Sequence, residues 1–308
     1  MLFASNLIGV EINNGGVICA MTAGSAASPR VERVSSAIFP PNTVQVSLRE
    51  QNIANPDSFI SGLKSAHSQL LSKSTRVAVS LPDGVCRIML LDYEGRFKSR
   101  QEAKDLIRWK LKKSIPFDSA DTHLDYQQLA VRENGDLALL VAVASRTVIS
   151  QYEELITKAG LSPAGIACNT LNICRLFDSR LSLRSDCILI SFYGSTLSVV
   201  AFAAGIPEFI RSKDLPGIAA TDSRVYMEIS SSLLVYKEQH PDQPLQSIFS
   251  VSAPDVAQTF LAMVSELTGS VPTLLETKGA VQPGNYAPGD QLRLFPCTAA
   301  IGAALGSC

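Results

Sequence analysis

Histidine is scarce in this chain of 308 residues, and its cysteines do not cluster. The three histidines, His67, His123 and His240, lie far apart, and the seven cysteines contain no Cys-x-x-Cys pair. Structural zinc sites and disulfide frameworks both need regular ligand or cysteine spacing. We therefore expect no metal site, and we interpret the cysteines as reduced thiols of a cytoplasmic protein.

An excess of positive charge is also absent. The formal net charge is −1 at pH 7, whereas proteins that bind nucleic acid usually carry a clear basic surplus. We therefore expect no nucleic acid among the partners. Basic residues gather only at 98–113. A solvated helix face is the simpler interpretation of this cluster, and a surface for a membrane or an acidic partner is the alternative.

We expect neither a secretion signal nor a membrane span. The first residues lack a basic segment, and Glu11 interrupts their apolar run. Residues 187–207 are 21 uncharged residues, a length that suffices to cross a bilayer. Small and polar residues gather in the middle of this stretch, at 191–196, however, and they favour a strand, a turn and a second strand. We interpret the stretch as a buried hairpin.

Two hairpin patterns recur in the chain. Residues 8–20 and 188–200 each consist of a strand pattern, a small polar turn and a second strand pattern. Their turns contain Asn-Gly and Gly-Ser, which accept positive φ angles. More extended chain follows each hairpin, at 30–39 and 209–213. Two halves that open alike predict a duplicated α/β fold with a cleft between the copies, and two unrelated hairpins in an α/β protein are the alternative.

Periodicity, capping and turn signals predict the remaining elements. The expected helices are 55–73, 98–113, 146–159, 168–177, 221–239, 254–268 and 298–305, and the expected strands are 76–81, 86–91, 122–130, 137–144, 247–251 and 274–275. Residues 279–290 are expected to form a loop with several glycines and prolines. The last helix, TAAIGAAL, consists mostly of small residues and suits tight packing at a domain junction.

The most specific pattern lies at 107–129. A basic amphipathic helix runs into Ile-Pro-Phe at 115–117, where Pro116 forces the residues before it out of the helix. After a turn, a strand contains Leu-Asp-Tyr-Gln at 124–127. This order of elements resembles the PilM family, the actin-like proteins of type IV pilus assembly, which are related to FtsA. The helix at 298–305 also resembles the final helix of that family.

The resemblance implies an α/β protein with a duplicated actin-like (ribonuclease H-like) fold and an inserted small β-α-β-β-α subdomain. The first actin-like subdomain would comprise residues 1–83, 162–185 and 291–308. The inserted subdomain would comprise 84–161, and the second actin-like half would comprise 186–290.

In the ATPases of this fold, two glycine-rich hairpins hold the phosphates through backbone N–H groups, and acidic residues position Mg²⁺ or water. Here the first hairpin keeps an acid, Glu11. The second hairpin should contain Asp-Ile-Gly and instead contains Ser191-Phe192-Tyr193, so a carboxylate is missing and a tyrosine takes the glycine position.

The third nucleotide element, which should end in Gly-Gly, has Ser252-Ala253 instead. The resemblance thus implies a degenerate nucleotide site formed by Glu11, Asn13, Asn14, Gly15, Gly16, Ser191, Gly194, Ser195, Thr196 and Ser252. We expect a pseudo-ATPase with no catalytic residues and no bound cofactor, and weak binding of ATP and Mg²⁺ is left open.

By resemblance, the protein would be a scaffold of the pilus assembly platform under the inner membrane. It would hold the N-terminal cytoplasmic peptide of a PilN-like single-pass membrane protein in a groove between the first and inserted subdomains, and it would meet other pilus assembly components. The candidate groove residues are Trp109, Ile115, Pro116, Phe117, Leu124 and Tyr126. For Trp109, the alternative is that the ring packs its helix onto its own sheet.

Two other functions stay open. An active actin-like ATPase would need a second carboxylate near the cleft, and Asp186 is the nearest candidate in the sequence. A component of type II secretion related to GspL is the other alternative. The cytoplasmic domain of such a protein normally continues into a transmembrane helix, of which this sequence shows no sign.

Overall fold

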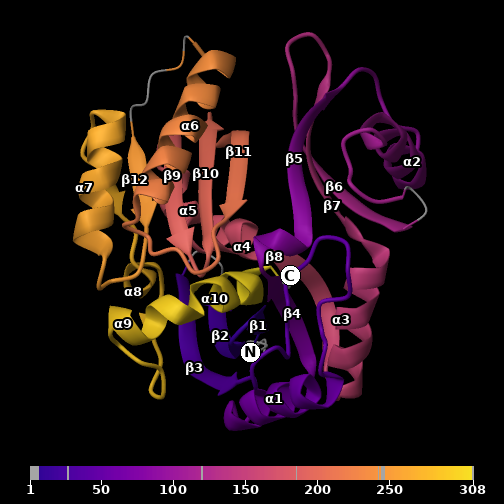
Figure 1. The fold of residues 1–308 in the computed structure, drawn as a ribbon, viewed down its shortest axis with the longest axis vertical. Helices are drawn as coiled ribbons and strands as arrows, with labels where there is room; N and C mark the ends of the chain where they lie inside the picture. The colour runs from indigo at the N-terminus through magenta and orange to yellow at the C-terminus, as the bar shows by residue number, and fades with distance from the viewer. Residues whose placement is uncertain are drawn as a thin grey trace.

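The structure, a computed structural model, describes residues 7–25, 28–118, 121–184, 186–241, 243 and 247–306. The strands form three sheets, of six, five and three strands. In Figure 1 the six-stranded sheet lies at the bottom, the five-stranded sheet at the upper left and the three-stranded sheet at the upper right. The predicted α/β class is therefore confirmed. No helix in the described part of the chain is both long and apolar enough to cross a bilayer.

The first sheet has the strand order β14-β3-β2-β1-β4-β8. Its strands are β1 (Leu7–Asn13), β2 (Gly16–Ser25), β3 (Ser28–Ile38), β4 (Arg76–Leu81), β8 (Ser162–Cys168) and β14 (Gln282–Pro283). One face packs against α1 (Pro56–Gln69) and α3 (Arg146–Lys158) in a shared apolar core. Alternation along β1 sends Ile8, Val10 and Ile12 into this core, so Glu11 points to the opposite face.

The five-stranded sheet repeats the pairing of the first sheet. Its order is β11-β10-β9-β12-β13, with β9 (Cys187–Tyr193), β10 (Thr196–Ala203), β11 (Ile206–Asp214), β12 (Ile248–Val251) and β13 (Thr273–Leu274). Strand β9 is antiparallel to β10 and parallel to β12, as β1 is to β2 and β4. Helices α6 (Ser223–Gln239) and α7 (Ala257–Thr268) cover one face. The predicted duplication and the predicted hairpin at 187–207 are thus confirmed.

The third sheet is antiparallel, with the order β5-β7-β6. Its strands are β5 (Cys86–Tyr93), β6 (Thr122–Val131) and β7 (Leu137–Ser145), and α2 (Arg100–Leu111) covers one face. The predicted order β-α-β-β-α is confirmed, although its last helix, α3, packs in the core of the first sheet. The predicted subdomain boundaries themselves stay predictions.

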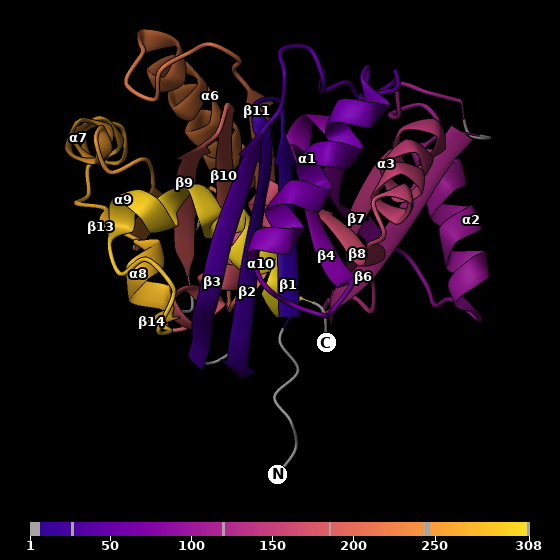
Figure 2. The same ribbon diagram turned by 90° about the horizontal axis from the view of Figure 1, so that it is seen from below.

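Helix α10 (Thr298–Leu305) lies between the two large sheets (Figure 2). It shares a core with α4 (Asn169–Leu176) and with residues of both sheets. The approach is so close that a Cβ atom at Gly302 would lie 2.0 Å from the carbonyl oxygen of Asn172, and one at Gly9 would lie 1.7 Å from that of Ala300. The expectation of tight packing by this small-residue helix is confirmed.

Several elements differ from the prediction. Helix α1 ends at Gln69, short of the predicted residue 73, because Leu71 has the left-handed φ of 53°. Strand β8 was not predicted, since Pro163 and Gly165 are unusual within strands. Strand β14 forms inside the predicted loop at 279–290. The short helices α5 (Asp178–Leu181), α8 (Thr277–Ala280) and α9 (Gln291–Leu294) were also missed.

Candidate functional site

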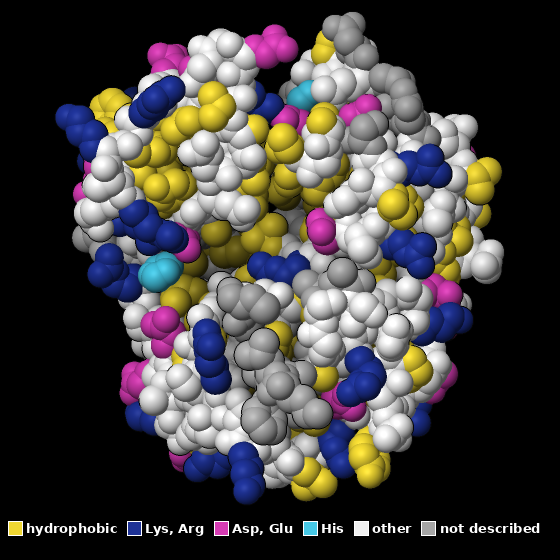
Figure 3. Space-filling model, turned by 180° about the vertical axis from the view of Figure 1, so that it is seen from behind, with side chains coloured by type: hydrophobic (Ala, Val, Ile, Leu, Met, Phe, Trp, Pro, Cys, Tyr) yellow, Lys and Arg dark blue, Asp and Glu magenta, His cyan; other side chains and the backbone are white. Residues whose placement is uncertain are grey.

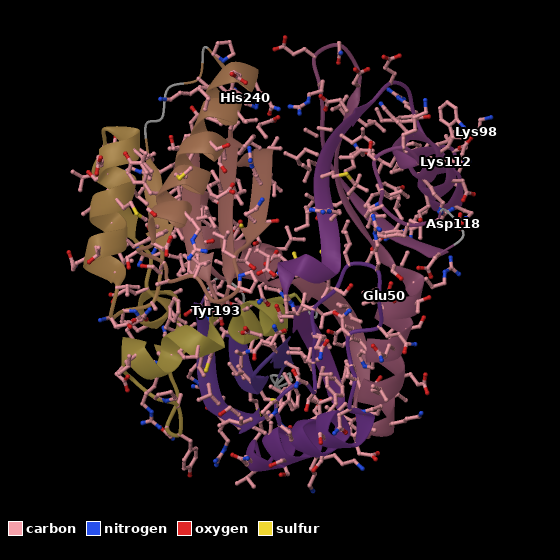
Figure 4. The ribbon with its side chains drawn as sticks, viewed as in Figure 1. Glu50, Lys98, Lys112, Asp118, Tyr193 and His240 are labelled. Atoms are coloured by element: carbon pink, nitrogen blue, oxygen red, sulfur yellow. The ribbon has the colours of Figure 1, made fainter. Side chains whose placement is uncertain are left out.

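Tyr193 fills the place where the two halves of the molecule meet. Its side chain is only 5% exposed and lies beside α10, between the two large sheets (Figure 4). The hydroxyl lies 2.8 Å from Oε2 of Glu11 and 2.7 Å from the carbonyl oxygen of Pro296. The ring packs edge-on against Phe295, with 5.4 Å between the ring centroids. A side chain of the second half thus contacts the central acid of the first.

Burial sets the protonation of this pair. It raises the pKa of Glu11 to about 8 and raises the pKa of Tyr193 well above its usual range. A phenol has one proton, so Tyr193 donates to only one of its two oxygen neighbours. Below pH 8 the protonated carboxyl of Glu11 can donate to the Tyr193 hydroxyl, which then donates to the carbonyl of Pro296. This arrangement hydrogen-bonds the Glu11 carboxyl, the Tyr193 hydroxyl and the Pro296 carbonyl while both side chains stay uncharged.

The backbone N–H groups of the first hairpin turn are hydrogen-bonded within the turn itself. Oδ1 of Asn13 accepts hydrogen bonds from the N–H groups of Gly15 and Gly16, both at 2.9 Å. In a phosphate-binding hairpin such N–H groups point at the ligand. Here the Asn13 side chain already occupies them, while Asn14 is exposed at the tip of the turn.

The second hairpin is likewise closed on itself. The Oγ atoms of Ser191 and Ser198 lie 2.6 Å apart across the buried pair of strands. Gly194 forms the turn with a φ of 60°, and Ser195 donates to the carboxylate of Asp214. Thr196, the first residue of β10, is buried. None of these groups offers a free carboxylate in the cleft.

Asp186, which the sequence suggested as a second carboxylate, does not lie in the cleft. Asp186 accepts a hydrogen bond from the N–H of Ala204. It precedes β9, whereas Tyr193 ends that strand, so the two lie about 20 Å apart at the usual rise per residue. The suggestion that Asp186 completes an ATPase site is therefore wrong. Ser252 is buried, and its Oγ has no hydrogen-bond partner among the described residues.

Asp83 is a buried acid that the sequence analysis missed. It accepts from the N–H of Thr170 at 3.2 Å, and burial raises its pKa. Its negative charge also contributes to the raised pKa of Glu11. The sequence signal that could have identified Asp83 is its position just after strand β4, which pairs in parallel with β1. The carboxyl ends of parallel strands meet at the same edge of a sheet, so Asp83 is expected near Glu11.

The cleft residues do not fit ATP and Mg²⁺. Tyr193 takes the space next to Glu11, the glycine N–H groups of the first turn are occupied, and Ser191 is bonded to Ser198 and carries no carboxylate. Among the described residues, no three His, Cys, Asp or Glu side chains gather closely enough to hold a metal ion.

A separate groove lies between the three-stranded sheet and the first sheet. Its volume is about 860 Å³, and Figure 3 shows a hollow with hydrophobic side chains on the back of the molecule. The apolar wall includes Leu140, Ala142 and Ala144 of β7, Ile149 of α3 and Ile166 of β8. The resemblance to PilM implied a groove in this region, between the first subdomain and the block at 84–161, and a groove is present there.

The predicted partner residues lie mostly on the other side of the three-stranded sheet. Of the six, only Tyr126 lines the groove. Ile115 and Leu124 are buried between α2 and its sheet, and Phe117 packs against the same core. Pro116 is half-buried beside them.

Trp109 is 77% exposed, so the alternative that its ring packs α2 onto the sheet is wrong. The groove residues that sequence reasoning missed are the polar residues of β6, His123, Asp125 and Gln127, which alternate with Leu124 and Tyr126. Strand alternation was the signal that could have found them.

Comparison with known proteins shows the fold. No protein-family model matches the chain, and no curated protein matches it. The chain is similar to a solved chain of the PilM–PilN type IV pilus biogenesis complex, with a TM-score of 0.83, 17% identity and 98% of each chain covered.

Two other similar structures are more distant. One is the cytoplasmic domain of EpsL, an inner membrane component of the type II secretion system of Vibrio cholerae (TM-score 0.54, 11% identity, 96% of this chain and 95% of that one). The other is a Bacteroides thetaiotaomicron protein with an actin-like ATPase fold and unknown function (TM-score 0.52, 11% identity, 91% and 93% covered). The fold is therefore actin-like, and the resemblance to PilM is confirmed at the level of the fold.

Proposed function

We propose that this protein is a non-catalytic cytoplasmic scaffold of type IV pilus assembly. In this proposal, the groove between the three-stranded sheet and the first sheet holds the N-terminal cytoplasmic peptide of a PilN-like membrane protein. The observation that carries the proposal is the combination of a cleft closed by Tyr193 with an open apolar groove. The similarity to the PilM fold, over 98% of both chains, supports it.

The closed cleft supports binding without catalysis. Phosphate transfer needs the phosphates and a metal held between the two hairpins. The Tyr193 ring lies there instead, and its hydroxyl is bonded to Glu11 and Pro296. A nucleotide would have to displace the buried ring of Tyr193. It would also have to break the hydrogen bonds that occupy the polar groups of both turns.

The groove is suited to an extended peptide because two sheet edges border it. Strand β6 is an edge of the three-stranded sheet, and β8 is an edge of the first sheet. Both strands contribute lining residues, His123 and Asp125 from β6 and residues 163–167 from β8. An extended chain can add to such an edge through main-chain hydrogen bonds, while alternate side chains enter apolar pockets. The floor formed by Leu140 and Ala142 would receive them.

Titration of the protein with a PilN-like N-terminal peptide and, separately, with ATP–Mg²⁺ tests the proposal. We expect the peptide to bind and ATP–Mg²⁺ not to bind. Ala164→Arg places a long charged side chain in the groove from an exposed position on β8, so it should reduce peptide affinity at least tenfold without unfolding the protein. Met227→Arg, at a 67%-exposed position on α6, is the matched control.

Two outcomes would contradict the proposal. If the folded Ala164→Arg protein keeps full peptide affinity, or the wild-type protein captures no such peptide, the groove is not the binding site. If ATP–Mg²⁺ binds tightly, the non-catalytic part is wrong.

A role in type II secretion is the second candidate, and the similarity to the EpsL cytoplasmic domain favours it. That similarity is weaker, with a TM-score of 0.54 against 0.83 for PilM. If the protein binds a peptide from a type II secretion component and does not bind the PilN-like peptide, the second candidate is supported.

A further inference from the structure

Helix α2 presents a tryptophan to solvent. Trp109 is the only tryptophan of the chain, and it is 77% exposed. At about 100° per helical residue, it lies on the side of α2 opposite Ile107, whose side chain is fully buried against the three-stranded sheet. The helix therefore packs through Ile107 and makes no use of Trp109 in its own core. Packing of α2 on its sheet therefore does not explain why a large apolar ring is present at this position.

Unpaired basic residues accompany the tryptophan. Lys112, three positions after it and still helical in its backbone angles, lies on the same face, and Lys113 follows. Lys98 stands before the start of the helix, and Figure 4 shows Lys98 and Lys112 at the outer edge of the molecule beside α2. These three lysines form no ion pair with any residue that the structure describes, whereas Arg100, Lys104 and Arg108 of α2 pair with Asp105 or Asp125.

The charge is concentrated in this segment. Residues 94–118 contain eight Lys and Arg against four Asp and Glu, although the whole chain has a formal charge of −1. Helix C-termini favour cations through the helix dipole, which accounts for basic residues in the last turn. The dipole does not account for Lys98, which lies at the other end of α2.

We propose that the outer face of α2, formed by Trp109, Lys98, Lys112 and Lys113, docks on an anionic lipid surface. Ammonium groups on mobile side chains are attracted to anionic headgroups, and each contributes a part of the binding. An indole combines an apolar body with a polar N–H, so it prefers the headgroup level of a bilayer. The combination of one exposed indole and several unpaired lysines matches that environment.

The shape of this surface favours lipid over an acidic protein. Protein partners usually anchor an aromatic residue in a concave, well-packed pocket. Trp109 instead stands on the convex outside of a helix, where a fluid layer of headgroups can surround it.

The residues of the proposed lipid surface, Trp109, Lys98, Lys112 and Lys113, are not among those that line the groove. Helix α2 covers one face of the three-stranded sheet, and most of the groove lies at the other face, as the alternation of Leu124 and His123 along β6 shows; of α2, only Arg100 lines the groove. Docking through α2 therefore leaves the groove open. The proposal does not rest on peptide binding, and a failure of one leaves the other untouched.

The experiment uses the full chain and vesicles of phosphatidylcholine with or without phosphatidylglycerol. Because Trp109 is the only tryptophan, its fluorescence reports on this face alone. We expect a blue shift of the emission and co-sedimentation with the anionic vesicles, neither with phosphatidylcholine alone, and loss of both at high salt. Lys112→Gln combined with Lys113→Gln should weaken partitioning by about 25-fold, at about fivefold for each lysine.

Two further variants complete the design. Lys64→Gln combined with Lys73→Gln removes two exposed lysines far from α2 and should leave vesicle binding unchanged. Trp109→Ser should weaken vesicle binding while leaving the unfolding midpoint unchanged, since the ring is outside the core. Absence of binding to anionic vesicles at low salt would overturn the proposal. Binding that persists in the Lys112/Lys113 variant with an unshifted Trp109 emission would overturn it as well.

Discussion

Glu11 and Tyr193 form a buried hydrogen-bonded pair in the cleft. Burial raises the pKa of Glu11 to about 8, so at neutral pH the carboxyl is mainly protonated. A protonated carboxyl cannot hold Mg²⁺, and it can donate a hydrogen bond to the Tyr193 hydroxyl. In the folded protein Glu11 therefore serves as a hydrogen-bonding partner of Tyr193.

The first prediction at this scale concerns pH. The native state keeps a proton on Glu11 between the ordinary carboxyl pKa of 4.5 and about 8, whereas the unfolded chain releases it. Stability from this group is therefore fully present below pH 4.5 and is lost as the pH rises to about 8, by up to ~1.4 kcal/mol per pH unit. Glu11→Gln is uncharged at every pH and can still donate to Tyr193, so it avoids this loss.

Urea unfolding of wild type and Glu11→Gln at several pH values between 5 and 9 checks the prediction, a range chosen to bracket the pKa of about 8. The difference in unfolding free energy should grow with pH in favour of the variant and level off above pH 8. Glu133→Gln, at an exposed site, controls for the substitution itself. A difference that stays constant with pH would show that Glu11 is ionised in the native state.

At the residue scale, the sequence indicated which residues depart from the motif of the resembled family, but not the contacts that these residues make. The tyrosine at the glycine position and the serine at the aspartate position are visible in the second hairpin. The contact of Tyr193 with Glu11 joins residues 182 positions apart, so no local pattern contains it. Similarly, apolarity identified Ile115 and Leu124 as important, but only the structure shows that they pack inside their own subdomain.

At the scale of elements, α10 depends on small residues. It packs against β1 and α4, and the carbonyl oxygen of Asn172 lies where a Cβ of Gly302 would be. Backbone cannot move aside as a flexible side chain can. The TAAIGAAL composition of the helix is therefore a requirement of the junction between the two halves.

Gly302→Ala should destabilise the protein by about 1–3 kcal/mol or more, the range for overpacking a tight core. Gly279→Ala is a helical control, because nothing lies within 4 Å of its Cβ position. In that control, the better helix propensity of alanine should leave the protein equally or more stable. Thermal unfolding of the two variants makes the comparison, and equal midpoints would mean that α10 is packed less closely than described.

Elements with a strong local signal were predicted well, and those that depend on tertiary pairing were not. Strand β4 and helix α10 have the bounds predicted from apolar runs and turn residues. Strand β8 contains a proline and a glycine and is a strand only because β4 pairs with it. The missed strand β8 borders the groove, so the sequence analysis also missed that wall of it.

At the scale of the whole molecule, two sets of polar contacts join one sheet to another: Arg132 links the two upper sheets of Figure 1, and Tyr193 links an upper sheet to the lower one. Arg132, after β6, donates two hydrogen bonds to Glu208 of β11, at 2.5 and 2.7 Å, and a third to Asp92. Tyr193 joins the second sheet to the first at α10. Arg132 is partly exposed, so solvent weakens its ion pair. The buried tyrosine is therefore the stronger of the two fixed points.

Tyr193→Phe tests this fixed point, because it keeps the ring packed on Phe295 and removes only the hydroxyl. Glu11 and the carbonyl of Pro296 then lose their shared partner in a buried site, which should cost about 1–3 kcal/mol of stability. Tyr226→Phe is the matched control, since the Tyr226 hydroxyl bonds to Glu266 at an exposed site.

Amide hydrogen exchange distinguishes a loosened junction from general destabilisation. If Tyr193 joins the halves, exchange in the phenylalanine variant should rise together in β1, in β9 and in α10, while α2 and the far end of α6 keep the wild-type protection. A rise confined to β9 would mean that Tyr193 stabilises only its own sheet. The two halves would then be held by the apolar surface of α10 alone.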